Sequence, residues 1–211
     1  MKIGIIGSGR MGSGLGTLWS TRRKHRVFFG SRKRMKSESL MQVAGPDSGG
    51  GIYEEAAEFG DVVVIALPWH TTESTVERLA PYLSGKTIID VTNPLTPQQD
   101  GLAIDGNTSG AQIIQSLVPD AHVVKAFNGI YFDMLDKPML NGQKLEIYYC
   151  GDNADAKAHT KELIEDLGFI AADLGTLDMA RYLETMIFIW IRRLQQGAIP
   201  PNSAINIFKQ R

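Results

Sequence analysis

Residues 2–12 read KIGIIGSGRMG, an apolar run that leads directly into a glycine turn. A continuous apolar run such as Lys2–Ile6 is typical of a strand in a parallel sheet that is covered on both faces. The next six residues match the spacing G-x-G-x-x-G, and apolar residues then recur at helical spacing. The stretch therefore predicts a strand, a tight turn and a helix over 11–22, which is the opening unit of a dinucleotide-binding fold.

The glycine turn is predicted to hold the pyrophosphate of a dinucleotide. Gly7 permits the tight turn, Gly9 lets the backbone approach the phosphates without a Cβ in the way, and Gly12 lets the helix pack on the strand. The N-terminus of the helix offers free N–H groups and positive potential to the phosphates. The alternative is a glycine turn that binds no ligand. The predicted contacts of this turn are Gly7, Ser8, Gly9, Arg10, Met11 and Gly12.

About twenty residues beyond the turn, an NAD-binding chain usually has a carboxylate that holds the ribose 2′-hydroxyl. Here residues 28–34 read FFGSRKR, with no Asp or Glu. The Ser31 hydroxyl and the Arg32 guanidinium can hold a 2′-phosphate instead, and Lys36 can add a charge from the following helix. The pattern predicts NADP(H) rather than NAD(H). The alternative is an exposed basic loop, and we expect either Lys33 or Arg34 to be simply solvated.

The rest of the chain alternates short apolar runs with longer amphipathic segments. This order predicts an α/β fold, a doubly wound Rossmann-type parallel sheet with a short C-terminal helical appendage. We expect an NADP-binding Rossmann domain over 1–176, and a helix and tail over 177–211 that complete the pocket or a dimer interface. Residues 45–51 are expected to be a surface turn. The expected strands are 2–6, 26–30, 61–67, 87–91, 122–127, 145–150 and 169–173, and the expected helices are 11–22, 53–59, 72–83, 109–118, 155–167 and 177–196.

Composition excludes several classes of partner. The net charge is −1, so the molecule as a whole does not attract nucleic acid or an anionic membrane. The apolar run near the C-terminus, 186–191, is far too short to span a bilayer. A single cysteine, Cys150, fits a reducing cytosol, and the histidines lack metal-ligand spacing. We therefore expect a cytoplasmic protein with no nucleic-acid partner, no membrane partner and no metal site.

Ligands of an open α/β sheet bind at the carboxyl ends of the strands, where the strand order reverses. Three segments follow expected strands there: 67–70 (LPWH), 92–95 (TNPL) and 126–128 (AFN). Their small, amide and aromatic side chains suit a nicotinamide ring and a flat partner. Trp69 either caps the ring pocket or packs in the core, and His70 either contacts the substrate or is an ordinary loop residue.

Six segments of the chain together resemble the NADPH-dependent oxidoreductases of the deazaflavin coenzyme (F420) type, and the cytosolic reductase domain of the STEAP metalloreductases is similar. The resemblance implies hydride exchange between NADPH and a deazaflavin (F420) or a flavin, FMN or FAD. It implies that the glycine turn, Ser31, Arg32 and Lys36 bind NADP, and that Leu67, Pro68, Trp69, Asn93 and Ala126 lie near the nicotinamide. The segments are IGIIGSGRMG (3–12), GSR (30–32), DVVVIALPW (61–69), VTNPL (91–95), VVKAFN (123–128) and DLGTLDMARYLE (173–184).

Transfer between two ring cofactors needs no acid or base from the protein, which only has to hold the rings face to face. We therefore predict an NADP-dependent oxidoreductase without a catalytic residue. The alternatives are a flavin-assisted metal-ion reductase and a non-catalytic NADP(H) sensor that binds a partner protein. Lys125, unusual in a strand expected to be buried, is expected to reach a carbonyl or a carboxylate, and the alternative is a catalytic role.

The last helix carries two further expectations. Arg181 and Glu184 are three residues apart and are predicted to pair with each other. Met186, Phe188 and Trp190 are bulky and apolar. They are expected either to close the pocket or to form the seam of a homodimer, since a short Rossmann domain that ends in an apolar helix often buries that helix on a second subunit.

Overall fold

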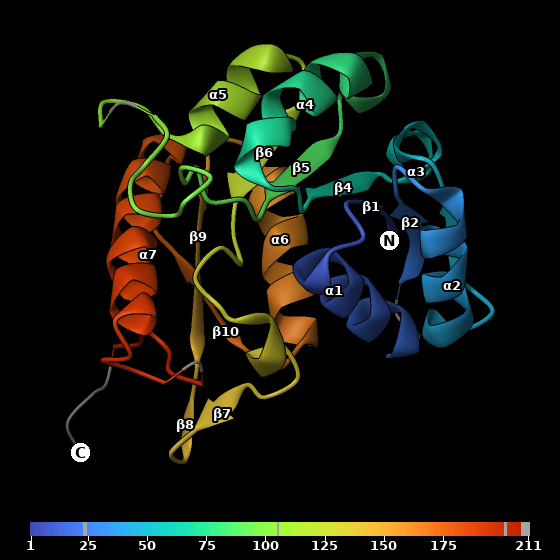
Figure 1. Cartoon of the computed structure of the whole chain (residues 1–211). Coiled ribbons are helices and arrows are strands. Elements are labelled where there is room, and N and C mark those ends of the chain that lie inside the picture. The colour runs from blue at the N-terminus through green and yellow to red at the C-terminus, as the bar shows by residue number, and fades with distance from the viewer. Residues whose placement is uncertain (23–24, 105, 201, 208–211) are drawn as a thin grey trace.

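The computed structural model describes residues 1–22, 25–104, 106–200 and 202–207. Its centre is an eight-stranded sheet in the order β10-β9-β6-β5-β4-β1-β2-β3 (Figure 1). Strand β1 pairs with β2 on one side and with β4 on the other, so the strand order reverses at β1. The sheet strands are β1 (Lys2–Ile6), β2 (Arg26–Gly30), β3 (Gly49–Gly51), β4 (Val62–Ile65), β5 (Thr87–Asp90), β6 (His122–Lys125), β9 (Glu146–Gly151) and β10 (Ile170–Asp173), and a separate hairpin joins β7 (Met139–Leu140) to β8 (Gln143–Lys144).

Helices cover both faces of the sheet and so create two cores. In β4, Val62 and Val64 pack into the core on the side of α1 and α6, whereas Val63 and Ile65 pack into the core on the side of α3, α4 and α5. All four side chains are buried, as expected of a central parallel strand. The helices are α1 (Arg10–Thr21), α2 (Arg34–Ala44), α3 (Tyr53–Phe59), α4 (Trp69–Leu83), α5 (Gly110–Leu117), α6 (Ala154–Asp166) and α7 (Ala180–Gln195), with short 3-10 turns η1 (Phe132–Met134) and η2 (Leu177–Met179).

Helix α7 packs beside α5 and β9, on the opposite side of the molecule from α2 (Figure 1). It is preceded by η2, so the helix expected over 177–196 is two elements. None of the helices in the described ranges is both long and apolar enough to cross a membrane.

The predicted fold class is confirmed, and the structure corrects two details. The sheet is not wholly parallel, because β9 runs antiparallel to β6. Residues 49–51 are not part of a surface turn but form β3, which pairs with β2. Helix α2 passes so close to this strand that a Cβ on Gly50 would lie 2.5 Å from the carbonyl oxygen of Ser37. The glycines therefore mark close backbone packing, which is an alternative role of glycine in strands.

Candidate functional site

The glycine turn lies between β1 and α1, at the point where the strand order reverses. Gly7 has φ of +120°, a conformation that favours glycine, and a Cβ on Gly12 would overlap the carbonyl oxygen of Gly7. Both predicted structural roles are thus confirmed. Around Gly9, by contrast, a Cβ would meet nothing within 4 Å. Gly9 is the N-cap of α1, and no side chain caps this helix, so its first N–H groups have no side-chain acceptor at the cap.

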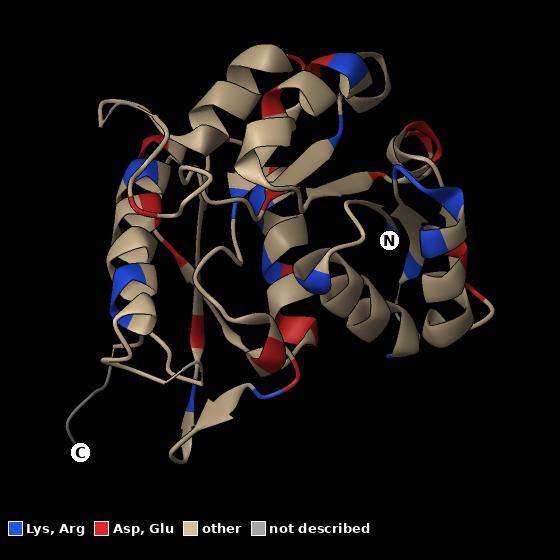
Figure 2. Cartoon of the chain, in the orientation of Figure 1, with Lys and Arg blue, Asp and Glu red and all other residues tan. Residues whose placement is uncertain are grey.

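The turn after β2 brings a hydroxyl pair and the basic residues together beside the glycine turn. Ser31 is 5% exposed, and its Oγ accepts hydrogen bonds from Ser8 Oγ at 3.0 Å and from the backbone N–H of Lys33 at 3.3 Å. Arg32 and Lys36 are exposed, and Figure 2 shows Lys and Arg but no Asp or Glu on the loop that joins β2 to α2. Helix α2 has no side-chain cap and no acidic residue in its first turn. The N-terminus of α2 and the side chains of the loop therefore form a positively charged surface, which we call the basic corner.

Arg34 does not contribute to this corner. Its guanidinium donates to Glu55 Oε1 at 2.6 Å across to α3, and both side chains are well exposed. This hydrogen bond to Arg34 and one from the backbone of Ile52 lower the pKa of Glu55. Lys33 is exposed.

A cavity of about 710 Å³ opens at the carboxyl ends of β1, β4, β5 and β6. Five aromatic side chains line it, and among the described lining residues there is no carboxylate and no lysine. Arg10 and His70 are the lining residues that can carry positive charge. Helix α7 supplies one wall. The aromatic lining residues are Trp69, Phe127, Tyr131, Phe132 and Trp190, and those from α7 also include Ile187, Ile191, Leu194 and Gln195.

The ends of β5 and β6 are held together beside the cavity by two asparagines. Asn93 Nδ2 donates to the carbonyl oxygen of Asn128, and Asn128 Nδ2 donates to Asn93 Oδ1, both at 3.1 Å. Between β6 and Asn128, Phe127 has φ of +59°, which is strained for a bulky side chain. Its buried ring packs edge-on to Trp19 at 5.7 Å, and this packing holds the strained backbone in place.

The structure brings six of the predicted residues to this cavity. Trp69 lines the cavity and also packs against Gly110, so its packing role is confirmed and its role as cap of a ring pocket stays a prediction. Ala126 is fully buried and does not line the cavity, although its neighbours Phe127 and Asn128 do. His70 also lines the cavity, from the first turn of α4 rather than from a loop. The sequence did not predict the loop 96–99 or the aromatic pair Tyr131–Phe132, since neither carries a motif. The six predicted residues are Arg10, Met11, Leu67, Pro68, Trp69 and Asn93.

Beneath the cavity floor, Lys125 reaches carboxylates as expected, and one of them corrects a prediction. The ammonium of Lys125 contacts Asp90 Oδ2 at 2.8 Å and Glu184 Oε1 at 2.7 Å, and all three side chains are buried. Glu184 therefore does not pair with Arg181, which donates instead to the hydroxyl of Tyr182 at 2.6 Å. The predicted pair was wrong because the fully buried ammonium of Lys125 needs the carboxylate more than the half-buried guanidinium of Arg181 does.

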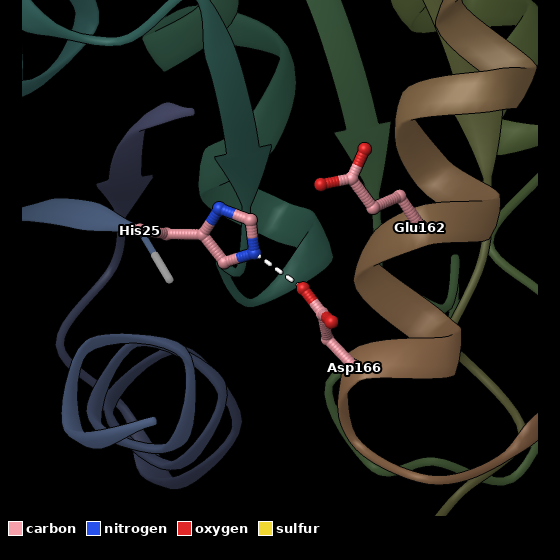
Figure 3. Close-up of side chains that lie close together, drawn as sticks. All are labelled: His25, Glu162 and Asp166. Carbon is pink, nitrogen blue, oxygen red and sulfur yellow. Dashed lines mark hydrogen bonds and ion pairs between the residues drawn. The ribbon is translucent and has the colours of Figure 1, made fainter. Parts of the chain in front are cut away.

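A second polar cluster lies away from the cavity, where His25, immediately before β2, faces Glu162 and Asp166 of α6 (Figure 3). His25 Nε2 donates to Asp166 Oδ2 at 2.6 Å, and both side chains are at most 5% exposed. Glu162 is exposed and lies one turn earlier on α6. Because His25 Nε2 is engaged by Asp166, we interpret the cluster as a buried pair that joins β2 to α6. The sequence could not indicate it, since its members are far apart along the chain.

Replacing His25 by alanine is expected to lower the free energy of unfolding by about 3 kcal/mol. The substitution removes the hydrogen bond from His25 and leaves the buried carboxylate of Asp166 less well stabilised. The midpoint of urea unfolding measures the change. Lys161→Ala is the matched control on α6, the helix that carries Asp166, because it breaks the exposed Lys161–Glu165 pair, and it should change the midpoint little. Equal midpoints for the two variants would contradict a structural role of His25.

Comparison with known proteins connects this architecture to a family. The sequence model described as "NADP oxidoreductase coenzyme F420-dependent" matches residues 2–94. An F420-dependent NADP reductase of Methanocaldococcus jannaschii is 28% identical over 200 residues, which cover 88% of this chain and 89% of that protein. Metalloreductase STEAP3 of Rattus norvegicus is 31% identical over 211 residues, and the match covers 98% of this chain but 40% of STEAP3.

Among solved structures, a putative F420-dependent NADP reductase from Arthrobacter sp. FB24 has the same fold. Its TM-score is 0.88 at 24% identity, with 99% of this chain and 100% of that chain covered. With relatives that are named NADP reductases and metalloreductases, the chain is an NADP-dependent oxidoreductase. Within that class its sequence is similar to the coenzyme F420-dependent NADP oxidoreductases, the family that the resemblance indicated.

Proposed function

We propose that the protein transfers a hydride between NADPH and a deazaflavin of the F420 type or a flavin. The observation that carries the proposal is the aromatic cavity of about 710 Å³, which adjoins the glycine turn at the carboxyl ends of the strands. A cavity of this size and apolar character suits flat ring systems. Its position is the one at which open α/β sheets bind dinucleotides.

The geometry of the glycine turn fits NADP(H). Gly9 borders open space that a Cβ would fill, and the uncapped N-terminus of α1 directs its N–H groups there. We propose that Gly7, Ser8, Gly9, Arg10, Met11 and Gly12 hold the pyrophosphate. We assign the 2′-phosphate to Ser31, Arg32 and Lys36 at the N-terminus of α2, since the loop 31–33 and the first turn of this helix carry no carboxylate.

The nicotinamide end of the cofactor is assigned to Leu67, Pro68, Trp69, Asn93 and the backbone near Ala126. The acceptor then lies toward α7, beside Trp190 and Ile191. We propose that residues 1–176 supply the cofactor site and that residues 177–211 complete the pocket. Of these two segments, residues 23–24, 105, 201 and 208–211 lie outside the described ranges.

Hydride transfer would be the contribution of bound NADPH and its ring-shaped acceptor. The described residues have three tasks: they orient both rings, they exclude water and they hold the strand ends still. Trp69, Phe127 and Trp190 provide apolar surface for this, and the two asparagines fix the ends of β5 and β6. No described lining residue is a carboxylate or a lysine, which suits a transfer that moves no proton to or from the protein.

Transfer of deuterium tests the proposal. NADPH deuterated at either face of C4 is mixed with coenzyme F420, FMN or FAD, and the reduced product is examined by mass spectrometry. The deazaflavin receives the hydride on carbon, so the label should be retained in reduced F420. If NADPH binds but none of the three acceptors is reduced, the hydride-transfer proposal is wrong and the non-catalytic sensor gains support.

A variant in the wall of the cavity sharpens this test. Ile191→Trp should obstruct the acceptor side and raise the KM for the acceptor at least tenfold, while the KM for NADPH changes little. Gln196→Trp is the matched control at an exposed position of the same segment that does not line the cavity.

The similarity to a metalloreductase suggests a second acceptor, a metal ion that is reduced through a flavin. In that case the reduction of ferric chelates by NADPH should require added flavin.

We also propose that α7 forms the seam of a homodimer. Tyr182 and Ile189 on this helix are 53% and 57% exposed, a high exposure for apolar side chains. Sedimentation equilibrium should give twice the monomer mass, and Ile189→Glu should give the monomer.

A cytosolic location is proposed as well, and cell fractionation tests it. Cys150, which is free and buried, is consistent with that location.

A further inference from the structure

The buried ion cluster under the cavity connects parts of the molecule that are far apart in sequence. Asp90 and Lys125 end β5 and β6 and lie opposite each other in the sheet register. Glu184 belongs to α7. The side chains of all three are at most 1% exposed. A cluster of this kind is costly to bury unless every charge is compensated.

Every hydrogen of the ammonium has an acceptor. Lys125 Nζ donates to Asp90 Oδ2 at 2.8 Å, to the carbonyl oxygen of Thr92 at 2.6 Å and to Glu184 Oε1 at 2.7 Å. Burial alone would lower the pKa of Lys125, but the charges of Asp90 and Glu184 outweigh it and the pKa is raised. The lysine therefore stays charged and is not available as a base.

The two carboxylates extend the network to the backbone. Asp90 Oδ1 accepts the N–H of Thr92 at 2.8 Å, so both polar backbone groups of Thr92 are fixed. Glu184 Oε2 accepts the N–H of Gly110 at 2.9 Å, at the first turn of α5. The dipole of α5 helps to compensate the second carboxylate.

Each end of this network is one step from the cavity. Asn93, which follows Thr92, lines the cavity and bonds to Asn128. On α7, Ile187 and Ile191 lie three and seven residues after Glu184, on the same helical face, and both line the cavity. Glu184 itself does not line the cavity. The network thus joins the strand ends on the cofactor side to the helix on the acceptor side.

We propose that Glu184 is a positioning residue: through Lys125 it fixes the acceptor-side wall, α7, relative to the strand ends beside the nicotinamide, without touching either ligand. This inference rests on the proposed function for the identity of the two ligands. It predicts a separation of effects. Loss of the Glu184 charge should impair use of the acceptor, while the glycine turn and the basic corner, which follow β1 and β2 rather than β5 and β6, still bind NADPH.

Glu184→Gln is the variant of choice, because it preserves shape and leaves a neutral Lys125–Asp90 pair. With coenzyme F420 and with FMN as probes, we expect the KM for the acceptor to rise at least tenfold and the KM for NADPH to change less than twofold. Thr185→Ala, the exposed neighbour on α7, is the control and should match the wild type. A folded Glu184→Gln protein with unchanged kinetics, or with both KM values raised equally, would overturn the inference.

Hydrogen exchange tests whether Glu184 couples nucleotide binding to α7, and this measurement needs no acceptor. In the wild type, NADP should slow amide exchange in the glycine turn and also in residues 184–195. In Glu184→Gln only the glycine turn should remain protected. Absence of protection in α7 of the wild type would contradict the coupling. If the wild type reduces neither probe, the proposed function fails, and the exchange result alone then decides this inference.

Should Glu184→Gln not fold, Glu184→Asp keeps the charge and shortens the side chain by one methylene. It should raise the KM for the acceptor selectively, in the same direction as Glu184→Gln. Kinetics of Glu184→Asp identical to those of the wild type would show that the length of this connection does not matter, which contradicts positioning.

Discussion

Replacing Arg32 by glutamate is expected to raise the dissociation constant for NADPH by roughly 10- to 150-fold, while the constant for NADH changes little. The estimate follows from the loss of one charged hydrogen bond, which is worth about 1.5–3 kcal/mol. A carboxylate at this position would also repel a 2′-phosphate and could accept a ribose 2′-hydroxyl instead. Quenching of tryptophan fluorescence by each nucleotide gives both constants.

The neighbouring loop residue offers a matched control for Arg32. Lys33→Glu makes the same change of charge at the next exposed position of the loop. We expect a smaller loss of affinity, because only long-range attraction is reduced there and salt screens it. If Arg32→Glu weakens both nucleotides equally, or if Lys33→Glu has the same effect as Arg32→Glu, the assignment of the 2′-phosphate to Arg32 is wrong.

Gly9→Ala is expected to separate nucleotide binding from stability. Gly9 has φ of −76° and ψ of 179°, which alanine adopts without strain, and its Cβ would meet no atom within 4 Å. The free energy of unfolding should therefore change by at most about 1 kcal/mol. The same Cβ would occupy the space through which the pyrophosphate reaches the backbone, so the affinity for NADPH should fall at least tenfold.

Gly12→Ala provides the contrast three residues later. There a Cβ would overlap the carbonyl oxygen of Gly7 and lie 3.0 Å from Ile5 Cγ2, so helix and strand would have to separate. Thermal unfolding should show a clear loss of stability in Gly12→Ala but not in Gly9→Ala. Normal NADPH affinity in a stable Gly9→Ala protein would refute the assignment of the pyrophosphate to this turn.

The parts of the site that the sequence predicted are those built by local geometry. The glycine turn follows from backbone conformation and close packing within six residues, and the structure has Gly7 and Gly12 in the expected roles. The three strand ends could be predicted because parallel strands place their carboxyl ends at one edge of the sheet. Trp69 and Asn93 accordingly lie at the cavity.

What the sequence did not predict depends on tertiary partners. Local spacing favoured an Arg181–Glu184 pair, but the need to neutralise buried Lys125 directs Glu184 inward. The glycine-rich stretch 45–51 has low strand propensity, and only the approach of α2 and the free edge of β2 make residues 49–51 a strand. Tyr131 and Phe132 reach the cavity at the start of the short 3-10 turn η1, which is too short for a periodic pattern of hydropathy to reveal it.

Because one wall of the cavity is a single C-terminal helix, the two halves of the pocket can diverge independently. The family model matches residues 2–94, which include the glycine turn and the basic corner, whereas α7 lies outside that range. If the cavity binds a ring-shaped acceptor, as proposed, substitutions in α7 would change which acceptor is bound and would leave the nucleotide preference unaltered. An attempt to redirect this enzyme to a new acceptor should begin by randomising the inward-facing positions of that helix.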